Sequence, residues 1–514
     1  MSKTIIIIGA GLAGLSATLQ AAENGCNVKL VSSLPSERAQ SVMAEGGINA
    51  ALNTKDENDS PEEHFTDTIK AACGLADPNA VWGMTQAAPE LVHWLLKLGV
   101  KFNMSGYDDV DLRNFGGQKK KRTAFAQSDT GKQIMTAMID AVRRKEASGM
   151  VERFSHHSFL TLRLCGNICC GCVIRDEYSQ ETVELPGDAV IVATGGMHGL
   201  FGNTTGSLSN TGEVTAELFR LGVPLANGEM IQYHPTTVKC GGKRMLISEA
   251  ARGEGGRLFA MKDGKQWYFM EEKYPELGNL MPRDITAREI WKVSHESEVF
   301  LDMTEISEEI ISNKLSGLAD DCMTYLHKDI RKEPVSVLPG IHYFMGGILV
   351  DEQHRTPIQN LYAAGECCAQ YHGANRLGGN SLLGALYGGR VAAKSACEQA
   401  DVVELSCATQ IDVPPASQIS EIKQLNKVMQ ETMGVVRNEN TLLNGIQTVQ
   451  ALTGNLPLLG MAVLKSALAR KESRGAHWRE DYPKSNDDDY LKTTVARFDG
   501  KQIQISFVPV PERR

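Results

Sequence analysis

The sequence predicts an α/β fold, and three observations lead to that class. A β-branched run over residues 4–8 is followed at once by a glycine-rich turn and then by a helical pattern of apolar residues. Two later segments, residues 188–196 and 360–366, repeat the theme of an apolar strand that ends at glycine. The chain has 514 residues, which is enough to divide into more than one domain.

The first element has the pattern strand, glycine turn, helix and strand. Gly9 permits the tight turn, Gly11 lets the backbone approach a pyrophosphate, and Gly14 lets the helix and strand pack closely. The N-terminus of the helix would offer free N–H groups to phosphates. Residues 4–31 therefore predict a dinucleotide-binding unit of Rossmann type, the alternative being a glycine-rich turn in an ordinary α/β domain.

The dinucleotide is expected to be FAD. The second strand ends in Ser32, and the acidic residue that usually follows such a strand in NAD-binding folds is missing. The small-residue turn at 41–48 could press its backbone against a flat ring. Three glycine-terminated strands from distant parts of the chain suggest one large cofactor contacted along its whole length, which fits FAD better than NAD.

Polar residues in five later segments form a second pattern. The segments contain His234, residues 248–256, Arg283, His342 and Arg376, each close to glycine or proline in a loop-like context. If they gather into one pocket, their arginines and histidines could clamp a small dicarboxylate and hand it a proton.

From Thr4 to about Pro483, the sequence resembles the flavoprotein subunit of succinate dehydrogenase and fumarate reductase, with L-aspartate oxidase as a close cousin. The resemblance rests on many motifs in the same order along the chain. They include residues 9–14, 44–47, 67–68, 115–117, 193–196, 232–236, 252–256, 283–284, 342–347, 364–366, 373–377, 380–382 and 470–477.

The resemblance implies a Rossmann-type FAD-binding domain interrupted by an α+β capping domain and followed by a helical C-terminal domain. We expect the FAD-binding domain over residues 1–229 and 341–400, the capping domain over 230–340 and the C-terminal domain over 417–514. Residues 413–417 look like a linker. Leu425, Met429, Met433 and Val436 then follow at helical spacing, which predicts an amphipathic helix.

The resemblance also implies the roles of single residues. It places His234, His342 and Arg376 around the substrate carboxylates with Ser248 helping, and it makes Arg283 the proton donor. Glu249 and Arg252 match the family's relay for returning a proton to Arg283. We expect the cofactor to contact Gly9, Ala10, Gly11, Gly14, Ser32, Ser41, Ala44, Glu45, Gly46, Gly47, Ala193, Thr194, Gly195, Glu213, Glu366, Arg376, Ser381 and Leu382.

Three positions depart from related patterns. Phe115 stands where aspartate oxidases carry a glutamate, and burying an unpaired ammonium against a phenyl ring would be costly, so Phe115 favours succinate or fumarate. Gln40 replaces the histidine that bonds covalently to the flavin in the respiratory complexes. FAD should therefore be noncovalent and of lower potential, better suited to reducing fumarate than to oxidising succinate. Glu213 replaces a shorter acid of the family.

Charge and hydropathy restrict the partners. The net charge is −9 and no long basic run is present, so nothing suggests nucleic acid. The apolar start is too short to span a bilayer, and neither a transmembrane helix nor a signal peptide is visible. We expect a cytoplasmic protein that reaches a membrane only through partner subunits. The sequence shows no haem motif and no second flavin domain, so its electron donor would be an iron–sulfur subunit or a diffusible reductant.

Four clustered cysteines leave two interpretations open. Cys165, Cys169, Cys170 and Cys172 could form an iron–sulfur or zinc site, or they could lie on a β-hairpin with a Gly-Asn turn. The hairpin is favoured, so we predict no metal. Two alternatives to fumarate chemistry also remain: an enzyme for aspartate or another 2-enoate, and a flavin-carrying scaffold without turnover.

Overall fold

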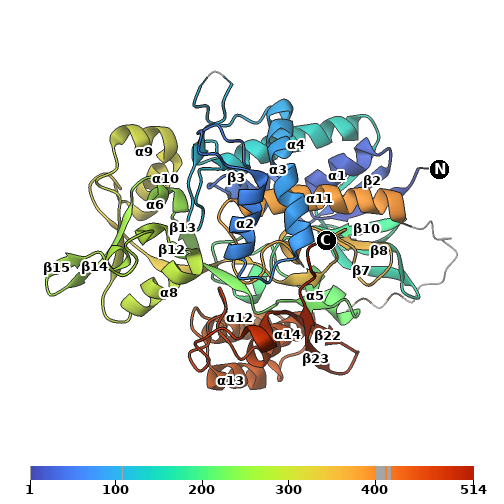
Figure 1. Ribbon diagram of the computed structural model, residues 1–514. Coiled ribbons are helices and arrows are strands. Elements are labelled where there is room, and N and C mark those ends of the chain that lie inside the picture. Colours follow the sequence, from blue (N-terminus) through green and yellow to red (C-terminus); the bar gives the residue numbers. More distant parts are fainter. Residues whose placement is uncertain (1, 107, 401–410, 412, 414–417) are drawn as a thin grey trace.

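The computed structural model describes residues 2–106, 108–400, 411, 413 and 418–514. Figure 1 shows a large α/β body, a group of green and yellow elements on one side of it, and the red C-terminal helices below. The description that follows starts with the sheet that carries the glycine turns.

A five-stranded parallel sheet lies at the centre of the α/β body. Its order is β20-β10-β1-β2-β6, and each neighbouring pair runs parallel. The strands are β1 (Thr4–Ile8), β2 (Asn27–Ser32), β6 (Val151–Ser155), β10 (Ala189–Val192) and β20 (Leu361–Ala363). The three glycine-terminated strands of the sequence, β1, β10 and β20, are thus direct neighbours, and their turns meet at one edge.

Both faces of this sheet are buried, which explains why β1 is apolar from Ile5 to Ile8. Successive side chains of a strand point to opposite faces. Ile5 and Ile7 share a core with helices on one face, and Ile6 and Ile8 share another core with a three-stranded sheet. The helices are α1 (Leu12–Glu23), α3 (Pro78–Leu98), α4 (Thr130–Ala147) and α11 (Asn380–Gln399), and the strands are β7 (His157–Cys165), β8 (Ile168–Asp176) and β9 (Thr182–Pro186).

The clustered cysteines lie on the hairpin of β7 and β8, as the favoured interpretation predicts. Leu164 pairs with Cys169 and Cys165 with Ile168 across the turn at Gly166 and Asn167. Cys169 and Cys172 are fully buried among apolar side chains. Among the described residues, no group of three or more His, Cys, Asp and Glu side chains is arranged to hold a metal ion.

Residues 231–344 form the separate group of elements at the left of Figure 1. One antiparallel sheet has the order β13-β12-β18 and a second has the order β15-β14-β16-β17. Strands β12 and β18 lie side by side and connect this group to the α/β body. The elements are β12 (Ile231–Cys240), β13 (Lys243–Leu246), α6 (Glu249–Gly253), β14 (Arg257–Lys262), β15 (Lys265–Trp267), α7 (Phe269–Lys273), α8 (Arg283–Val293), β16 (Val299–Asp302), α9 (Glu308–Lys314), α10 (Ser316–Asp321), β17 (Val335–Ser336) and β18 (Leu338–Phe344).

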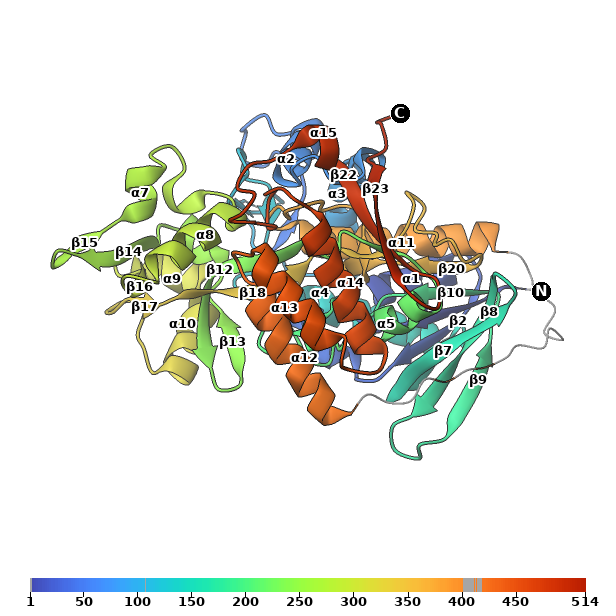
Figure 2. The same cartoon turned by 90° about the horizontal axis from the view of Figure 1, so that it is seen from below.

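The C-terminal part packs α12 (Ile419–Thr432), α13 (Glu439–Val449) and α14 (Asn455–Ala469) together, below the body in Figure 1 and in front of it in Figure 2. Leu425 and Met429 of the predicted amphipathic helix are buried, but the helix ends at Thr432, so Val436 lies beyond it. Of the predicted linker, only Val413 is among the described residues.

The C-terminal part also contains a hairpin that helical spacing does not reveal. Strands β22 (Lys492–Phe498) and β23 (Ile503–Pro509) complete a sheet with β11 (Leu225–Ala226), β19 (Gly347–Leu349) and β21 (Cys368–Ala369). The C-terminal part is therefore bonded into the α/β body through shared strands. None of the helices in the described part of the chain has the length and apolar character needed to cross a bilayer.

Candidate active site

Two histidines come together because they lie on neighbouring antiparallel strands. His234 on β12 is directly opposite Gly340, and His342 is two residues further along β18. Their ring centroids are 5.1 Å apart. The Nδ1 atom of His234 lies 3.0 Å from the Thr236 carbonyl oxygen, and the Nδ1 atom of His342 lies 2.8 Å from the Thr205 hydroxyl. Nδ1 of each ring is thereby held in place.

Both histidines are neutral at physiological pH. Burial, and after it the positive charge of Arg283, hold the pKa of His234 well below its usual range. The same two causes, in the same order, lower the pKa of His342, with Arg376 as a further contributor. A neutral imidazole can offer a hydrogen bond to a ligand without adding a charge.

A buried carboxylate, Glu249, joins two arginines. Its Oε2 atom accepts hydrogen bonds from Arg283 Nε at 2.8 Å and from Arg283 Nη2 at 2.6 Å. Its Oε1 atom accepts from the Gly116 amide at 3.2 Å and lies 3.3 Å from Arg252 Nη2. Burial opposes ionisation, but the charges of Arg283 and Arg252 outweigh it and lower the pKa of Glu249. The group is therefore ionised.

Arg376 completes the polar cluster from the α/β body. Its guanidinium lies over the ring of Tyr343, 4.4 Å from the centroid. Burial, together with the charge of Arg283, lowers its pKa to about 9, so it stays charged at neutral pH. Its buried Nε atom has no hydrogen-bond partner among the described residues, which leaves a charged donor for a ligand.

The predicted substrate residues that remain lie around Glu249. Phe115 is buried, and a side chain on Gly46 or Gly378 would touch its ring. Ser248 caps α6, accepting a hydrogen bond from the Ala250 amide at 3.4 Å; burial raises the pKa of the nearby Glu45 carboxyl, and the Ser248 hydroxyl opposes that rise. The structure therefore brings all the predicted catalytic and substrate-binding residues into one region.

Positive charge is in excess in the polar cluster formed by Arg252, Arg283, Arg376 and Glu249. Arg252, Arg283 and Arg376 supply three guanidinium groups against the single carboxylate of Glu249. With neutral histidines, these four residues carry a net charge of about +2, and the Glu366 carboxylate acts on Arg376 from outside them. A ligand with two carboxylates would neutralise it.

The glycine turns form a cradle at the ends of β1 and β10. Gly9 has a φ angle of 111°, and an added Cβ would collide with the Ala193 carbonyl. A Cβ at Gly14 would collide with the carbonyl of Gly9. The Ser41 hydroxyl accepts a hydrogen bond from the Leu12 amide in the first turn of α1 at 3.2 Å. These contacts explain the glycines and leave the helix N-terminus facing the turn.

An unpaired polar atom marks the adenosine side of this cradle. The Ser32 hydroxyl, at the end of β2, is buried without a hydrogen-bond partner among the described residues. A ribose hydroxyl would supply that partner, since this strand end holds the ribose in dinucleotide-binding folds. The residues present therefore fit a dinucleotide.

The other predicted cofactor residues surround the same edge of the sheet. Glu366 follows β20, and its Oε1 atom accepts a hydrogen bond from the Phe344 amide at 3.1 Å. Ser381 and Leu382 belong to the first turn of α11, and Gly47 packs against Thr123 and Ala124. Glu213 is exposed at the first position of α5 (Glu213–Arg220), and the charged groups that act on its carboxylate are Arg175 and Glu177. Three groups of predicted residues remain. Ala10 and Gly11 lie in the turn after β1, Thr194 and Gly195 lie in the turn after β10, and Ala44, Glu45 and Gly46 follow the short helix Gln40–Met43.

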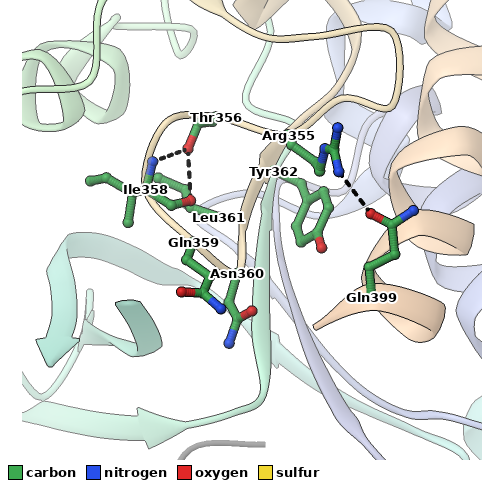
Figure 3. Close-up of a pocket in the computed structure, with 8 residues that line it drawn as sticks. All are labelled: Arg355, Thr356, Ile358, Gln359, Asn360, Leu361, Tyr362 and Gln399. Carbon is green, nitrogen blue, oxygen red and sulfur yellow. Dashed lines mark hydrogen bonds between the residues drawn. The ribbon is translucent and has the colours of Figure 1, made fainter. Parts of the chain in front are cut away.

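A cavity of about 210 Å³ elsewhere in the body is not this site. Figure 3 shows its lining, in which the Thr356 hydroxyl bonds the Ile358 backbone and Arg355 bonds Gln399. It lies at the start of β20, at the opposite end of the strand from the glycine turns.

Two residues that organise the cluster, Gln232 and Tyr343, lie within motifs quoted from the sequence, but sequence reasoning gave neither of them a role. Gln232 accepts a hydrogen bond from Arg283 Nη1 at 3.1 Å and donates to the Arg376 carbonyl at 2.8 Å. It lies two positions before His234 on β12, and that spacing could have signalled a shared face. Tyr343, under Arg376, lies next to His342 in a quoted motif, but its place under the guanidinium depends on the folded chain.

Comparisons with known proteins cover nearly the whole chain. Residues 4–382 match the FAD binding domain family, and residues 452–513 match the family described as fumarate reductase flavoprotein C-term. The chain is 38% identical to the succinate dehydrogenase flavoprotein subunit of Bacillus subtilis, covering 100% of this chain and 98% of the relative. It is 32% identical to the 8-methylmenaquinol:fumarate reductase flavoprotein subunit of Wolinella succinogenes, covering 100% and 92%.

Solved structures agree with these matches. A variant of the FrdA chain of E. coli quinol fumarate reductase has a TM-score of 0.89 and 27% identity, and the match covers 99% of this chain and 97% of that chain. Mycobacterium smegmatis Sdh1 has a TM-score of 0.84 and 28% identity, covering 100% and 95%. The predicted fold class is thereby confirmed.

Proposed function

The chain belongs to the succinate dehydrogenase and fumarate reductase flavoprotein family, and from this premise we propose that it interconverts fumarate and succinate. It is an FAD-dependent oxidoreductase, and it would act as the flavoprotein subunit of a larger enzyme. The observation that carries the substrate assignment is the net charge of about +2 in the cluster of Arg252, Arg283, Arg376 and Glu249. Fumarate and succinate each carry two negative charges that match it.

The substrate carboxylates would be held by Arg376 and the two histidines. Arg376 offers its unpaired Nε atom, and its planar fork suits a carboxylate. A Thr205 hydroxyl that donates to His342 Nδ1 leaves the proton of that ring on Nε2, where it can bond a substrate oxygen. Polarising one carboxylate in this way would stabilise negative charge that develops on the neighbouring carbon.

Arg283 would deliver the proton. When bound, FAD supplies the hydride at one substrate carbon, and the other carbon needs a proton. Arg283 is fixed by Glu249 on one side and by Gln232 on the other. A proton could return to Arg283 through Glu249. The Oε1 atom of Glu249 lies 3.3 Å from Arg252 Nη2, and its Oε2 atom lies 2.6 Å from Arg283 Nη2. The two oxygens of one carboxylate thus link both arginines.

The cofactor is proposed to bind without a covalent bond. Gln40 lies in the short helix Gln40–Met43, next to Ser41, whose hydroxyl bonds the first turn of α1. Glutamine has no imidazole to attach to the flavin ring. We therefore propose a noncovalent, lower-potential flavin that favours fumarate reduction.

The electron partner would be an iron–sulfur subunit. The names of the relatives describe flavoprotein subunits of larger enzymes. A membrane would be reached only through such partners.

Replacing Arg283 tests the proton assignment. The Arg283→Ala protein should keep its FAD absorbance and lose fumarate reduction with a reduced viologen. Arg288→Ala is a matched control, because this arginine lies on the same helix over Trp478, 4.1 Å from the ring centroid, and outside the cluster. Retained turnover in Arg283→Ala would contradict the proton-donor role.

Titration of the flavin absorbance tests the substrate class. Fumarate and malonate should perturb the spectrum, whereas aspartate should not, because Phe115 offers no charge to an ammonium group. Hydrogen peroxide formed from aspartate would instead support the amino-acid oxidase alternative.

A further inference from the structure

Two cysteines far apart in the sequence meet at the ends of two helices. Cys26 lies between α1 and β2, and Cys397 lies in the last turn of α11. The Sγ atom of Cys26 donates a hydrogen bond to the Sγ atom of Cys397, with 3.0 Å between the sulfurs. Both are free thiols. The pair lies at the opposite ends of α1 and α11 from the cofactor turns.

The surroundings of the pair make oxidation chemically possible. Cys26 is 5% exposed, whereas Cys397 is partly exposed and can meet a small molecule from solvent. The Lys3 ammonium donates a hydrogen bond to the Cys397 carbonyl at 2.8 Å. Burial and the neighbouring Cys26 thiol raise the pKa of Cys397 above its ordinary value, and the positive charge of Lys3 acts in the opposite direction. The reactive thiolate therefore forms more readily as the pH rises, so what favours the reaction is the short distance between the sulfurs and the partial exposure of Cys397.

We propose that Cys26 and Cys397 form a reversible disulfide when the protein meets hydrogen peroxide. The Cys397 thiolate attacks one peroxide oxygen, so that an S–O bond forms, the O–O bond breaks and hydroxide leaves. The Cys26 thiolate then attacks the Cys397 sulfur, the S–S bond forms and the second hydroxide leaves. The two thiol protons convert the hydroxides to water, so two thiols and one peroxide give one disulfide and two waters.

Helix α1, which ends just before Cys26, and helix α11, which carries Cys397, are held against each other, and the 3.0 Å between the sulfurs leaves little movement for the bond to form. The Ser16 hydroxyl of α1 donates to the Leu386 carbonyl of α11 at 2.6 Å, and Gly389 of α11 packs against the Ala13 carbonyl. The disulfide would join positions 371 residues apart and so restrict most of the unfolded chain. The oxidised protein should therefore unfold, and release its flavin, at a higher temperature than the reduced protein.

The bond itself is tested on the full chain with its flavin bound. The protein is treated with hydrogen peroxide, free thiols are then alkylated under denaturing conditions, and the digest is analysed by mass spectrometry without reductant. A linked peptide that contains Cys26 and Cys397 should appear, and dithiothreitol should remove it. Cys240→Ser, which alters a partly exposed thiol on β12, should still form the link.

Two single variants separate the steps. Cys26→Ser should stop at the sulfenic acid of Cys397, trapped by dimedone, and should lose the oxidative shift in flavin-release temperature. Cys397→Ser should lose both the link and the dimedone adduct at this pair. If both thiols are alkylated in full at peroxide doses that oxidise Cys240, or if oxidation stops at unlinked acids in the unaltered chain, the proposal is wrong.

Discussion

Glu249→Gln changes one atom of the proposed proton path and removes its only carboxylate. In the folded chain, the side chain accepts two hydrogen bonds from Arg283 through Oε2 and one from the Gly116 amide through Oε1, and Arg252 lies beside Oε1. Glutamine has the same shape, but the NH₂ group of its amide would face either the Arg283 guanidinium or the Gly116 amide, and both of these are also hydrogen-bond donors. The change therefore leaves the arginines without their buried counter-charge.

The expected cost follows from burial. Glu249 is 2% exposed, and removing one partner of a buried ion pair costs about 3–5 kcal/mol. A native protein is stable by only about 5–15 kcal/mol, so the thermal midpoint should fall clearly. If Glu249 also returns protons to Arg283, kcat for fumarate reduction should fall by about 10²–10⁴, the usual range for losing a general acid–base group.

The assay measures kcat per bound flavin, so that a loss of folded protein does not count as a loss of chemistry. Glu217→Gln is a matched control, because Glu217 is also a 2% exposed carboxylate, bonded by Arg220 at 2.8 Å three residues away and remote from the cluster. The control should lose stability and keep kcat. If Glu249→Gln also loses stability and keeps kcat per flavin, the carboxylate is structural and the relay is refuted.

Three further outcomes are expected. Acid precipitation should release all the FAD into the supernatant because Gln40 cannot bond it, and flavin retained in the pellet would contradict this. Burial raises the pKa of Glu45 to about 8 from 4.5, so between these pH values the folded chain keeps a proton that the unfolded chain loses. The thermal midpoint of the flavin-free chain should therefore fall as the pH rises from about 5 to about 8, and Glu45→Gln should make the midpoint less dependent on pH. Arg470→Met should lower the thermal midpoint sharply, because the buried carboxylate of Glu229, 2.7 Å from Arg470, loses its ion pair and Glu472, also 2.7 Å away, keeps only Arg474 as its charged partner; an unchanged midpoint would refute the pairing.

The cofactor cradle could be predicted because its determinants are local. Gly9 and Gly14 act within one strand, turn and helix, where each glycine prevents a collision with a nearby carbonyl. The later glycine-ended strands could also be assigned, and in the sheet β10 pairs with β1 and β20 pairs with β10. Glu213 could not be placed by such reasoning, since nothing local fixes where the side chain of the first residue of a helix points.

The residues of the polar cluster could be named from the sequence, but the hydrogen bonds that join them could not. Its members were named through resemblance, whereas the bonds that hold them depend on long-range pairing. Gln232 is the clearest case, because its contacts to Arg283 and Arg376 exist only when β12 and α8 lie against the α/β body. The C-terminal hairpin was missed for a related reason, because its partner strand β11 lies more than two hundred residues away in the sequence.

Two hydrogen bonds join the α/β body to residues 231–344 at the polar cluster. The Gly116 amide of the body donates to Glu249 of α6, and Gln232 donates to the Arg376 carbonyl. These bonds hold Arg252, Arg283 and Arg376 close together, which like charges resist. A bound dicarboxylate would remove that repulsion, so ligand and closure should favour each other. A monocarboxylate would leave about one positive charge unmatched and should close the site less well, which is why charge, more than shape, would select the substrate.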